Sequence, residues 1–354
     1  MSDQSTKRIS QKKIAKALGY SQALVSMVLN RRKEGISKDA YQRIWDYAIT
    51  NRYSPRGMIT DTVRGTSNVL TIGYILRSPL NLVNKSNFFN HIHQGLHDHL
   101  DQHGIKLVFL GSEDDIPFNS LPKMTVLSDS VNGIAIMGEV QPETLECVSQ
   151  LGLPVAYISS KATGKCHSVL SNEAESGSML VDHLCKLGHS KFAWLGGNKF
   201  MGRHSDRYSG VFDALKRHNL SLDQNCIVRL NGADRIEGFN AAKQIVESTY
   251  PELPTAWICF NGLMARGAIS YLFQNRYHVP RDINISAIDL TNVCTEENPT
   301  ITSASAIPEE MGSEAARILL GSITGFFKSF IDVTLHPQLR VLDSTSPIEK
   351  KVAR

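Results

Sequence analysis

Five residues between positions 22 and 30 have a spacing and a chemistry suited to contacting the edges of DNA bases. On a short helix, Gln22, Ala23, Ser26, Met27 and Asn30 face outward, while the apolar residues between them face inward. Amide and hydroxyl groups can hydrogen-bond to base edges, and apolar side chains can contact thymine methyl groups in the major groove. The segment therefore predicts a recognition helix for duplex DNA.

Neighbouring segments are predicted to hold this helix in place. A preceding helix buries Ile14, Ala15 and Leu18, Gly19 can take the left-handed conformation that ends it, and Ser21 can cap the next helix. A third helix, capped at Ser37, completes a small shared core. Its inward-facing residues are Ala40, Ile44, Tyr47 and Ala48. The same pattern would also fit an ordinary helical hairpin at the start of a globular protein.

The distribution of charge favours DNA binding over that alternative. Residues 1–68 contain 13 Lys and Arg against 5 Asp and Glu, a net charge of +8. The whole chain carries 38 against 34, so residues 69–354 hold 25 against 29, a net charge of −4. A basic module joined to a mildly acidic body is typical of a protein that binds the phosphates of DNA through that module.

Length and composition indicate an ordinary globular protein with more than one domain. The chain has 354 residues, 42% of them hydrophobic and 20% charged. It contains no apolar run of the ~20 residues that span a bilayer and no apolar signal segment, so we expect a cytoplasmic, nucleoid-associated protein with no membrane partner. Six scattered cysteines without a CxxC pair predict free, buried thiols.

From about residue 69 the sequence alternates between strand and helix patterns. Strands that are apolar throughout, separated by amphipathic helices, predict parallel sheets covered on both faces, arranged as two α/β lobes with a ligand cleft between them. The predicted strands are 70–76, 106–110, 133–137, 155–158, 192–195, 256–260 and 285–288. The predicted helices lie near 88–103, 142–150, 173–187, 205–218, 235–249 and 262–276.

Residues 55–68 form the junction between the basic module and the lobes. Pro55, Gly57, Gly65 and several β-branched residues disfavour a free-standing helix, yet Ile59 and Val63 are spaced as on one helix edge. The segment is consistent with a hinge that folds on contact with DNA or with a passive linker.

The sequence resembles the lactose-repressor (LacI/GalR) family over most of its length. The run IAKALGYSQALVSMVLN, then Ile36-Ser37, Tyr53 and Pro55, follows the pattern of that family's DNA-binding module. Further matches are VNGIAIMG, LPVAYIS, HLCKLGHSKFAWLGG, RYSG at 207–210, PTAWICFN and INISAID. The resemblance implies a helix-turn-helix head at 1–54, a hinge at 55–68, a two-lobed effector domain like periplasmic binding proteins at 69–345 and a tail at 346–354. It also implies a homodimeric regulator that we expect to act as a repressor on a pseudo-palindromic operator.

The same resemblance assigns roles within the DNA-binding region. It implies that Ser10 and Ser21 contact phosphates, while Gln22, Ala23, Ser26 and Met27 face base edges. Asn30 would end the recognition helix against the backbone, and Val63, with Thr62 as the alternative, would enter the minor groove. Many relatives have an Arg where Met27 stands, so guanine recognition is expected to give way to thymine-methyl contact.

For the cleft, the resemblance points to Ser159, Arg207, Asn261 and Thr291 as contacts for a small-molecule effector. Several carboxylates that grip sugar hydroxyls in the family are replaced, because its ND pair reads Asn261-Gly262 and its GYDD strand end reads Asp289-Leu290-Thr291-Asn292. A sugar, a different metabolite or no effector at all are the alternatives.

Other constellations point to no further chemistry. Five histidines on the predicted helix 88–103 include pairs at i, i+4, which can chelate zinc or nickel, but no Cys or carboxylate set completes a site. We therefore expect neither a metal nor a cofactor. No nucleophile, zinc-protease or P-loop motif is present, which argues against an enzyme. A transporter's solute-binding protein would share the two lobes but not the basic head.

Overall fold

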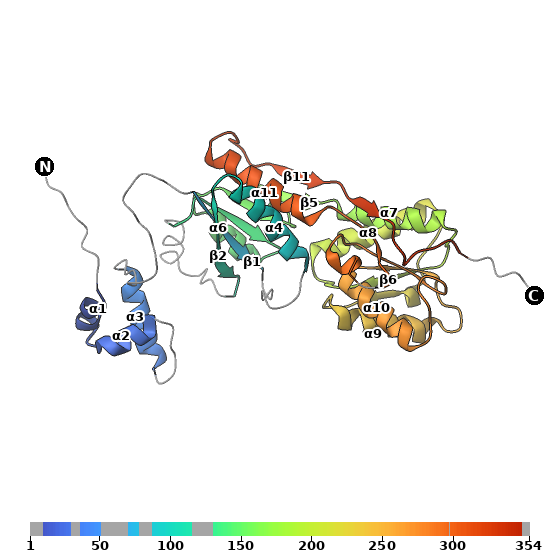
Figure 1. The fold of residues 1–354 in the computed structure, drawn as a ribbon, viewed down its shortest axis with the longest axis horizontal. Coiled ribbons are helices and arrows are strands. Elements are labelled where there is room, and N and C mark those ends of the chain that lie inside the picture. Colours follow the sequence, from blue (N-terminus) through green and yellow to red (C-terminus); the bar gives the residue numbers. More distant parts are fainter. Residues whose placement is uncertain are drawn as a thin grey trace, which may run out of the picture. The chain divides into compact units, whose positions relative to one another are not determined.

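The computed structural model describes residues 10–29, 36–50, 70–77, 87–114, 130–296 and 298–348, which belong to two compact units. The first unit is the N-terminal head, where α1 (Gln11–Leu18), α2 (Gln22–Leu29) and α3 (Lys38–Thr50) share one apolar core (Figure 1). Ile14, Val25, Val28 and Ile44 are fully buried in this core. The head thus has a small core of its own.

Local capping interactions define where the helices of the head begin and end. The Ser10 hydroxyl accepts a hydrogen bond from the Lys13 amide at the start of α1, and the Ser37 hydroxyl accepts one from the Ala40 amide at the start of α3. Gly19 has φ 72°, in the left-handed region, and ends α1. A residue with a Cβ would be strained there, which explains why a glycine makes the turn.

The second unit contains two α/β lobes, each built on a sheet with six described strands. In the first lobe the strand order is β11-β5-β4-β3-β1-β2, and every pairing is parallel. The strands are β1 (Thr71–Leu76), β2 (Lys106–Ser112), β3 (Gly133–Met137), β4 (Val155–Ile158), β5 (His167–Ser171) and β11 (Asp332–Leu335). Its helices are α4 (Asn87–Asp101), α6 (Pro142–Ser149) and α11 (Pro308–Ile323), and α11 packs along α4 (Figure 1).

The second lobe has the strand order β12-β10-β9-β8-β6-β7, in which only the β10–β12 pairing is antiparallel among the described strands. The strands are β6 (Phe192–Gly196), β7 (Ile227–Arg229), β8 (Ala256–Cys259), β9 (Asn284–Ala287), β10 (Thr302–Ser305) and β12 (Gln338–Arg340). Helices α7 (Glu173–Lys186) and α8 (Gly202–Arg217) pack together, as do α9 (Arg235–Thr249) and α10 (Gly262–Gln274). In Figure 1 these two pairs lie on opposite sides of the sheet.

The chain passes between the lobes three times. It leaves the first lobe after β5, returns after β10 to form α11 and β11, and ends in the second lobe with β12. Each lobe has its own apolar core. Ile92, Leu96 and Leu100 of α4 are fully buried in the first core, as are Trp194 and Trp257 in the second. The two lobes are therefore joined by three segments of the chain.

These observations confirm the predicted fold class: a helical head and a two-lobed α/β domain with parallel sheets. The apolar pattern did not predict β5, β7, β10, β11, β12 or α11. The prediction that strand 106–110 is covered on both faces is wrong, because β2 lies at the sheet edge and leaves Val108 and Phe109 exposed. Of the helices described, none has the length and apolarity needed to cross a membrane. All six cysteines are free thiols.

Candidate functional site

The outward face of α2 is the first candidate site. Gln22, Ala23 and Met27 are exposed, with Met27 keeping 37% of its surface accessible, and Ser26 is half-buried beside them. Val25, Val28 and Leu29 occupy the opposite, buried face. An eight-residue helix with this division can enter a major groove while its inner face remains packed on α1 and α3. Asn30 lies outside the described residues.

Both serines expected at phosphates also cap helices. The Ser21 hydroxyl accepts a hydrogen bond from the Leu24 amide at 3.1 Å, and the Ser10 hydroxyl accepts one from the Lys13 amide at 3.3 Å. A hydroxyl that accepts in this way still has its own O–H to donate to a phosphate oxygen. Capping therefore places each hydroxyl at an exposed helix N-terminus without using up its donor.

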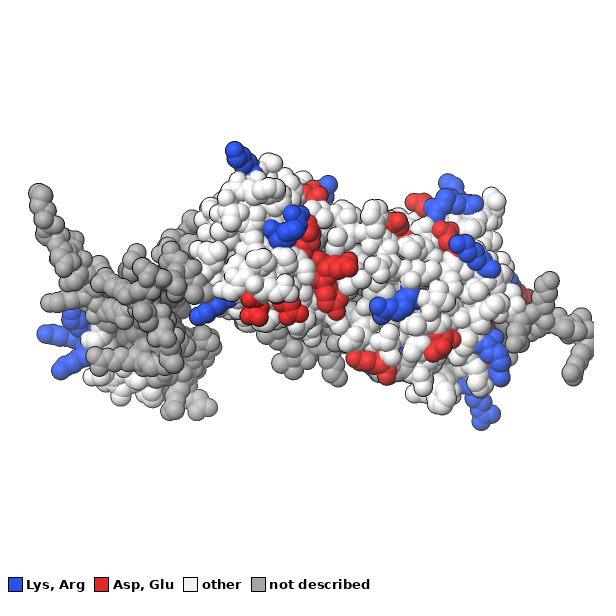
Figure 2. Space-filling view, turned by 45° about the horizontal axis from the view of Figure 1, so that its top comes forward, with Lys and Arg blue, Asp and Glu red and all other residues white. Residues whose placement is uncertain are grey.

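Basic side chains surround this part of the head. Lys12, Lys13 and Lys16 are exposed on α1. Figure 2 shows basic side chains on the described part of the head, whereas acidic and basic side chains are mixed over the visible face of the lobes. The positive potential needed for phosphate binding is thus concentrated on the unit that carries α2. The hinge residues Thr62 and Val63 lie outside the described residues.

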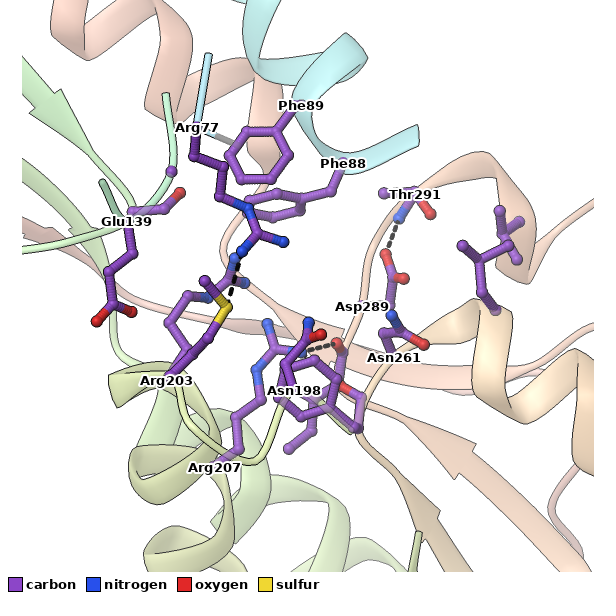
Figure 3. A pocket seen from close by; sticks show the side chains of 17 residues that line it. Arg77, Phe88, Phe89, Glu139, Asn198, Arg203, Arg207, Asn261, Asp289 and Thr291 are labelled. Atoms are coloured by element: carbon purple, nitrogen blue, oxygen red, sulfur yellow. Dashed lines mark hydrogen bonds between the residues drawn. The ribbon is translucent and has the colours of Figure 1, made fainter. Parts of the chain in front are cut away.

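The second candidate site is a cavity of about 80 Å³ between the two lobes (Figure 3). The first lobe contributes Arg77 after β1, Phe88 and Phe89 of α4, and Ser159 after β4. The structure places all four residues expected at the effector in its wall, namely Ser159, Arg207, Asn261 and Thr291. Their separation by up to 132 positions in the sequence is bridged by the parallel sheets, whose carboxyl ends meet at the cleft.

Arg207 is the most firmly held of these residues. Only 2% of it is exposed, and its Nε donates to Glu173 Oε2 at 2.5 Å. Its Nη1 donates to the carbonyl oxygens of Phe260 and Ile288, and its guanidinium lies 4.5 Å from the Phe260 ring centre. Arg207 therefore ties together the ends of β8 and β9, and it holds a fixed positive charge at the cavity.

Asn261 and Asp289 have structural partners. The Asn261 side chain accepts from the Met264 amide at 2.9 Å, which caps α10, and donates to the Ala233 carbonyl at 2.8 Å. Asp289 accepts from the amides of Gly262 and Thr291 at 2.9 and 2.8 Å. Both side chains line the cavity. Their main polar groups are nevertheless already committed to holding the wall in shape.

Ser159 and Thr291 differ from these two residues. Ser159 is 5% exposed and Thr291 1%, and the hydroxyl of each is buried without a hydrogen-bond partner. Ser159 also has φ 71°, and Asn198, another wall residue, has φ 50°. Left-handed backbone at residues with a Cβ is strained and is found preferentially at functional sites. Unpartnered hydroxyls in a strained wall are suited to a ligand that supplies the missing partner.

Sequence reasoning missed four charged residues of this region: Arg77, Glu139, Arg203 and Glu173. Glu173 begins α7 and accepts from the Nε atoms of both Arg203, at 2.8 Å, and Arg207. Burial opposes ionisation of Glu173, but the two guanidiniums outweigh it and hold the pKa of the carboxyl below its ordinary value. The spacing of Arg203 and Arg207, four residues apart on one helix, was a visible signal of this cluster.

The histidines of α4 form no metal centre in the described part of the chain, where no group of three potential ligands is close enough together. His93 stacks on His97 and His99 on His103, with ring centres 6.1 and 5.0 Å apart. His91 instead contacts Glu309 of α11. The described contacts therefore give these histidines roles on the helix surface and in helix packing.

Comparison with known proteins bears on both sites. A periplasmic binding protein-like domain matches residues 181–345. The HTH-type transcriptional repressor PurR of Actinobacillus pleuropneumoniae serotype 3 is 24% identical over 343 residues, covering 96% of this chain and 99% of that protein. PurR of Vibrio atlanticus is 26% identical over 333 residues, covering 93% and 96%.

Solved structures share the fold over nearly the full length. The lac repressor dimer bound to operator and the anti-inducer ONPF superposes with a TM-score of 0.67 at 19% identity, covering 96% of this chain and 100% of that one. The regulator CelR in complex with cellobiose gives 0.66 at 20% identity, covering 95% and 100%.

A helix-turn-helix head joined to a two-lobed, periplasmic-binding-protein-like body defines a class of ligand-responsive DNA-binding proteins. In sequence and fold this chain is similar to transcriptional regulators of the lactose-repressor (LacI/GalR) family. The curated relatives are named as transcriptional repressors.

Proposed function

We propose that the protein is a repressor that binds a pseudo-palindromic operator as a homodimer in the cytoplasm. The observation that supports this most directly is the exposed face of Gln22, Ala23 and Met27 on a separately packed, basic head. One such helix contacts only a few base pairs. Two heads related by a twofold axis are therefore needed to recognise a DNA site long enough to be specific. The relatives named repressors and the lac repressor dimer on its operator support the same arrangement.

We further propose that a small molecule in the inter-lobe cavity controls DNA binding. Because the cavity wall is contributed by both lobes, a ligand there changes the balance between open and closed lobes. DNA affinity then changes by as much as the ligand prefers one state over the other. CelR in complex with cellobiose is an example of a similar fold that binds a small molecule, which supports this role. The unpartnered hydroxyls of Ser159 and Thr291 lie in the cavity wall, which favours a regulator with an effector over one without.

The cavity is proposed to bind its ligand without transforming it. The Glu173 and Asp289 carboxylates, which would be candidate acid or base groups, already accept hydrogen bonds on both oxygens. A carboxylate held in this way is a poor proton acceptor. No cofactor is needed for such a binding role.

The proposal is tested by electrophoretic mobility shift with promoter DNA over a series of salt concentrations. A dimer that makes ~6–10 phosphate contacts should lose ~10³–10⁵ in affinity between about 50 and 200 mM salt. Lys13→Gln should weaken binding to all sequences alike and lower the salt dependence by about one phosphate contact. Binding that is insensitive to both salt and sequence would refute DNA regulation by this head.

A further inference from the structure

The inter-lobe cavity has many hydrogen-bond donors and few free acceptors. Each carboxylate oxygen of Glu173 and Asp289 already accepts one hydrogen bond, from Arg203 and Arg207 or from two backbone amides. Glu139 Oε2 accepts from the Gly202 amide at the start of α8. Each guanidinium carries five N–H donors and no acceptor. A ligand that fits this wall must therefore bring acceptor atoms.

Arg77 is the donor with the least satisfied side chain. Its Nε is buried without a partner, and its Nη1 meets only the Met201 sulfur, a weak acceptor. Arg77 makes no ion pair within the described residues, although Glu139 and Glu113 are near enough to favour its charge. Burial is the larger effect and lowers its pKa. Arg77 thus lacks the anionic partner that a half-buried guanidinium normally has.

Three guanidiniums, those of Arg77, Arg203 and Arg207, converge on this cavity (Figure 3). Burial lowers the pKa of Arg203 to about 10, and although Glu173 opposes this, the neighbouring charges of Arg207 and Arg77 add to it. Like charges that approach each other in a region shielded from water repel strongly. An anion placed among them would remove this repulsion as well as fill the unused donors.

The remaining wall limits the size and shape of such an anion. Ser159 and Thr291, on opposite lobes, supply unpartnered hydroxyls, and Leu263, Ile288 and Val293 supply apolar surface. The cavity is only about 80 Å³. A compact molecule with one charged group and a small apolar body satisfies all of these features.

We propose that the effector is a compact metabolite bearing an oxyanion, a carboxylate or a phosphate, and that Arg77 is its principal partner. This inference rests on the proposed function of the cavity as the effector site. Arg77 comes from the first lobe, whereas Arg203 and Arg207 come from α8 in the second. An anion that bridges them favours the closed arrangement of the lobes and so is the form of ligand best able to change DNA affinity.

The test uses matched probes and the full-length dimer. Isothermal titration calorimetry compares benzoate with benzamide, which differ mainly in charge, and phenyl phosphate with phenol, which lacks the phosphate group. Both anions, or one of them, should bind at least about tenfold more tightly than the neutral partner. Whichever anion, benzoate or phenyl phosphate, binds more tightly distinguishes a carboxylate effector from a phosphate effector.

Arg77→Gln should weaken binding of the preferred anion about 10- to 100-fold, the range expected for losing a hydrogen bond between charged groups. Arg217→Gln is the matched control, because it removes the same charge from the exposed end of α8 and should leave anion binding unchanged. Operator binding by both variants in the mobility-shift assay shows that they are folded.

Three results would overturn the inference: benzamide or phenol binding as tightly as its anion, equal effects of Arg77→Gln and Arg217→Gln, or no binding of either anion at up to about 10 mM. In each case normal operator binding by the wild-type protein would leave DNA regulation intact. Loss of salt- and sequence-dependent DNA binding would instead refute the proposed function, whatever the calorimetry shows.

Discussion

Glu173→Gln should destabilise the second lobe strongly. The wild-type carboxylate lies between Arg203 and Arg207, with Nε–Oε distances of 2.8 and 2.5 Å. The side chains of Glu173 and Arg207 are only 6% and 3% exposed, and that of Arg203 19%. Gln keeps the size of Glu but removes the negative charge, so two guanidiniums would remain buried beside each other without a counter-ion.

Breaking a buried ion pair by removing one partner typically costs about 3–5 kcal/mol, since the other charge stays desolvated. Glu173 serves two guanidiniums, so we expect the loss to reach the upper part of this range, about 4–5 kcal/mol in the free energy of unfolding. For a domain of this size the unfolding midpoint should fall by roughly 10 °C. Arg207 would also lose the anchor that aligns it with the ends of β8 and β9.

Urea unfolding followed by tryptophan fluorescence measures this loss where it occurs. Trp194 and Trp257 are fully buried in the core of the second lobe and report its unfolding directly. The matched control is Glu252→Gln, which removes the same charge from the exposed pair with Lys191. Exposed pairs contribute little to stability, so the midpoint of the control should match that of the wild type.

The reasoning would be refuted if Glu173→Gln unfolded at the same urea concentration as Glu252→Gln. That result would mean that water or a mobile counter-ion reaches the two guanidiniums in the native protein. Restoration of the midpoint by about 10 mM phosphate in the variant alone would show that an added anion can take the place of the carboxylate.

Three further predictions follow from other parts of the structure. Met27→Ala should relax preference at one position in each half-site while leaving nonspecific affinity unchanged in mobility shifts; equal weakening on every sequence would assign Met27 to packing. Gly95→Ala should lower the free energy of unfolding by about 1–3 kcal/mol, because the added Cβ would lie 1.9 Å from the Glu309 carbonyl oxygen. The thermal midpoint measured by circular dichroism should fall accordingly. A gain in stability from helix propensity would contradict this close packing. Burial lowers the pKa of His204 below 6.5, so the unfolded state binds a proton more readily than the folded state does. Stability measured in urea should therefore fall as the pH drops from about 7.5 to 5.5. His204→Gln should reduce that fall, and an unchanged pH dependence would contradict the prediction.

The parts of the fold that the sequence predicted are those with strong local signals. Continuous apolar runs such as 133–137 and 155–158 became central strands, and Gly19 with Ser21 marked the turn between α1 and α2. β10 escaped prediction because Thr302, Ser303 and Ser305 are fully buried yet carry no apolar signal. Their place in the core depends on pairing with β9 and β12, which no short window of sequence contains.

The cavity likewise depends on contacts between distant parts of the chain that the sequence does not reveal. Arg207, Asn261, Ser159 and Thr291 were named from motif positions, and the structure places them in one wall, but their different roles came only from their contacts. Asn261 caps a helix, whereas Thr291 has an unused hydroxyl. Arg77 gave no signal because it is a single charged residue after a strand. Its importance depends on α8, more than 120 positions away, approaching it.

Because the chain passes between the lobes three times, the parts of the protein become able to fold at different stages of its synthesis. The head is complete once Thr50 has been synthesised, but the first lobe lacks α11 and β11 until Leu335 has been added. At the usual rate of translation that interval is roughly 15–60 s. During it, a nascent chain can present a folded DNA-binding head without a finished sensor. A prematurely terminated chain would carry a DNA-binding head that cannot respond to the proposed effector.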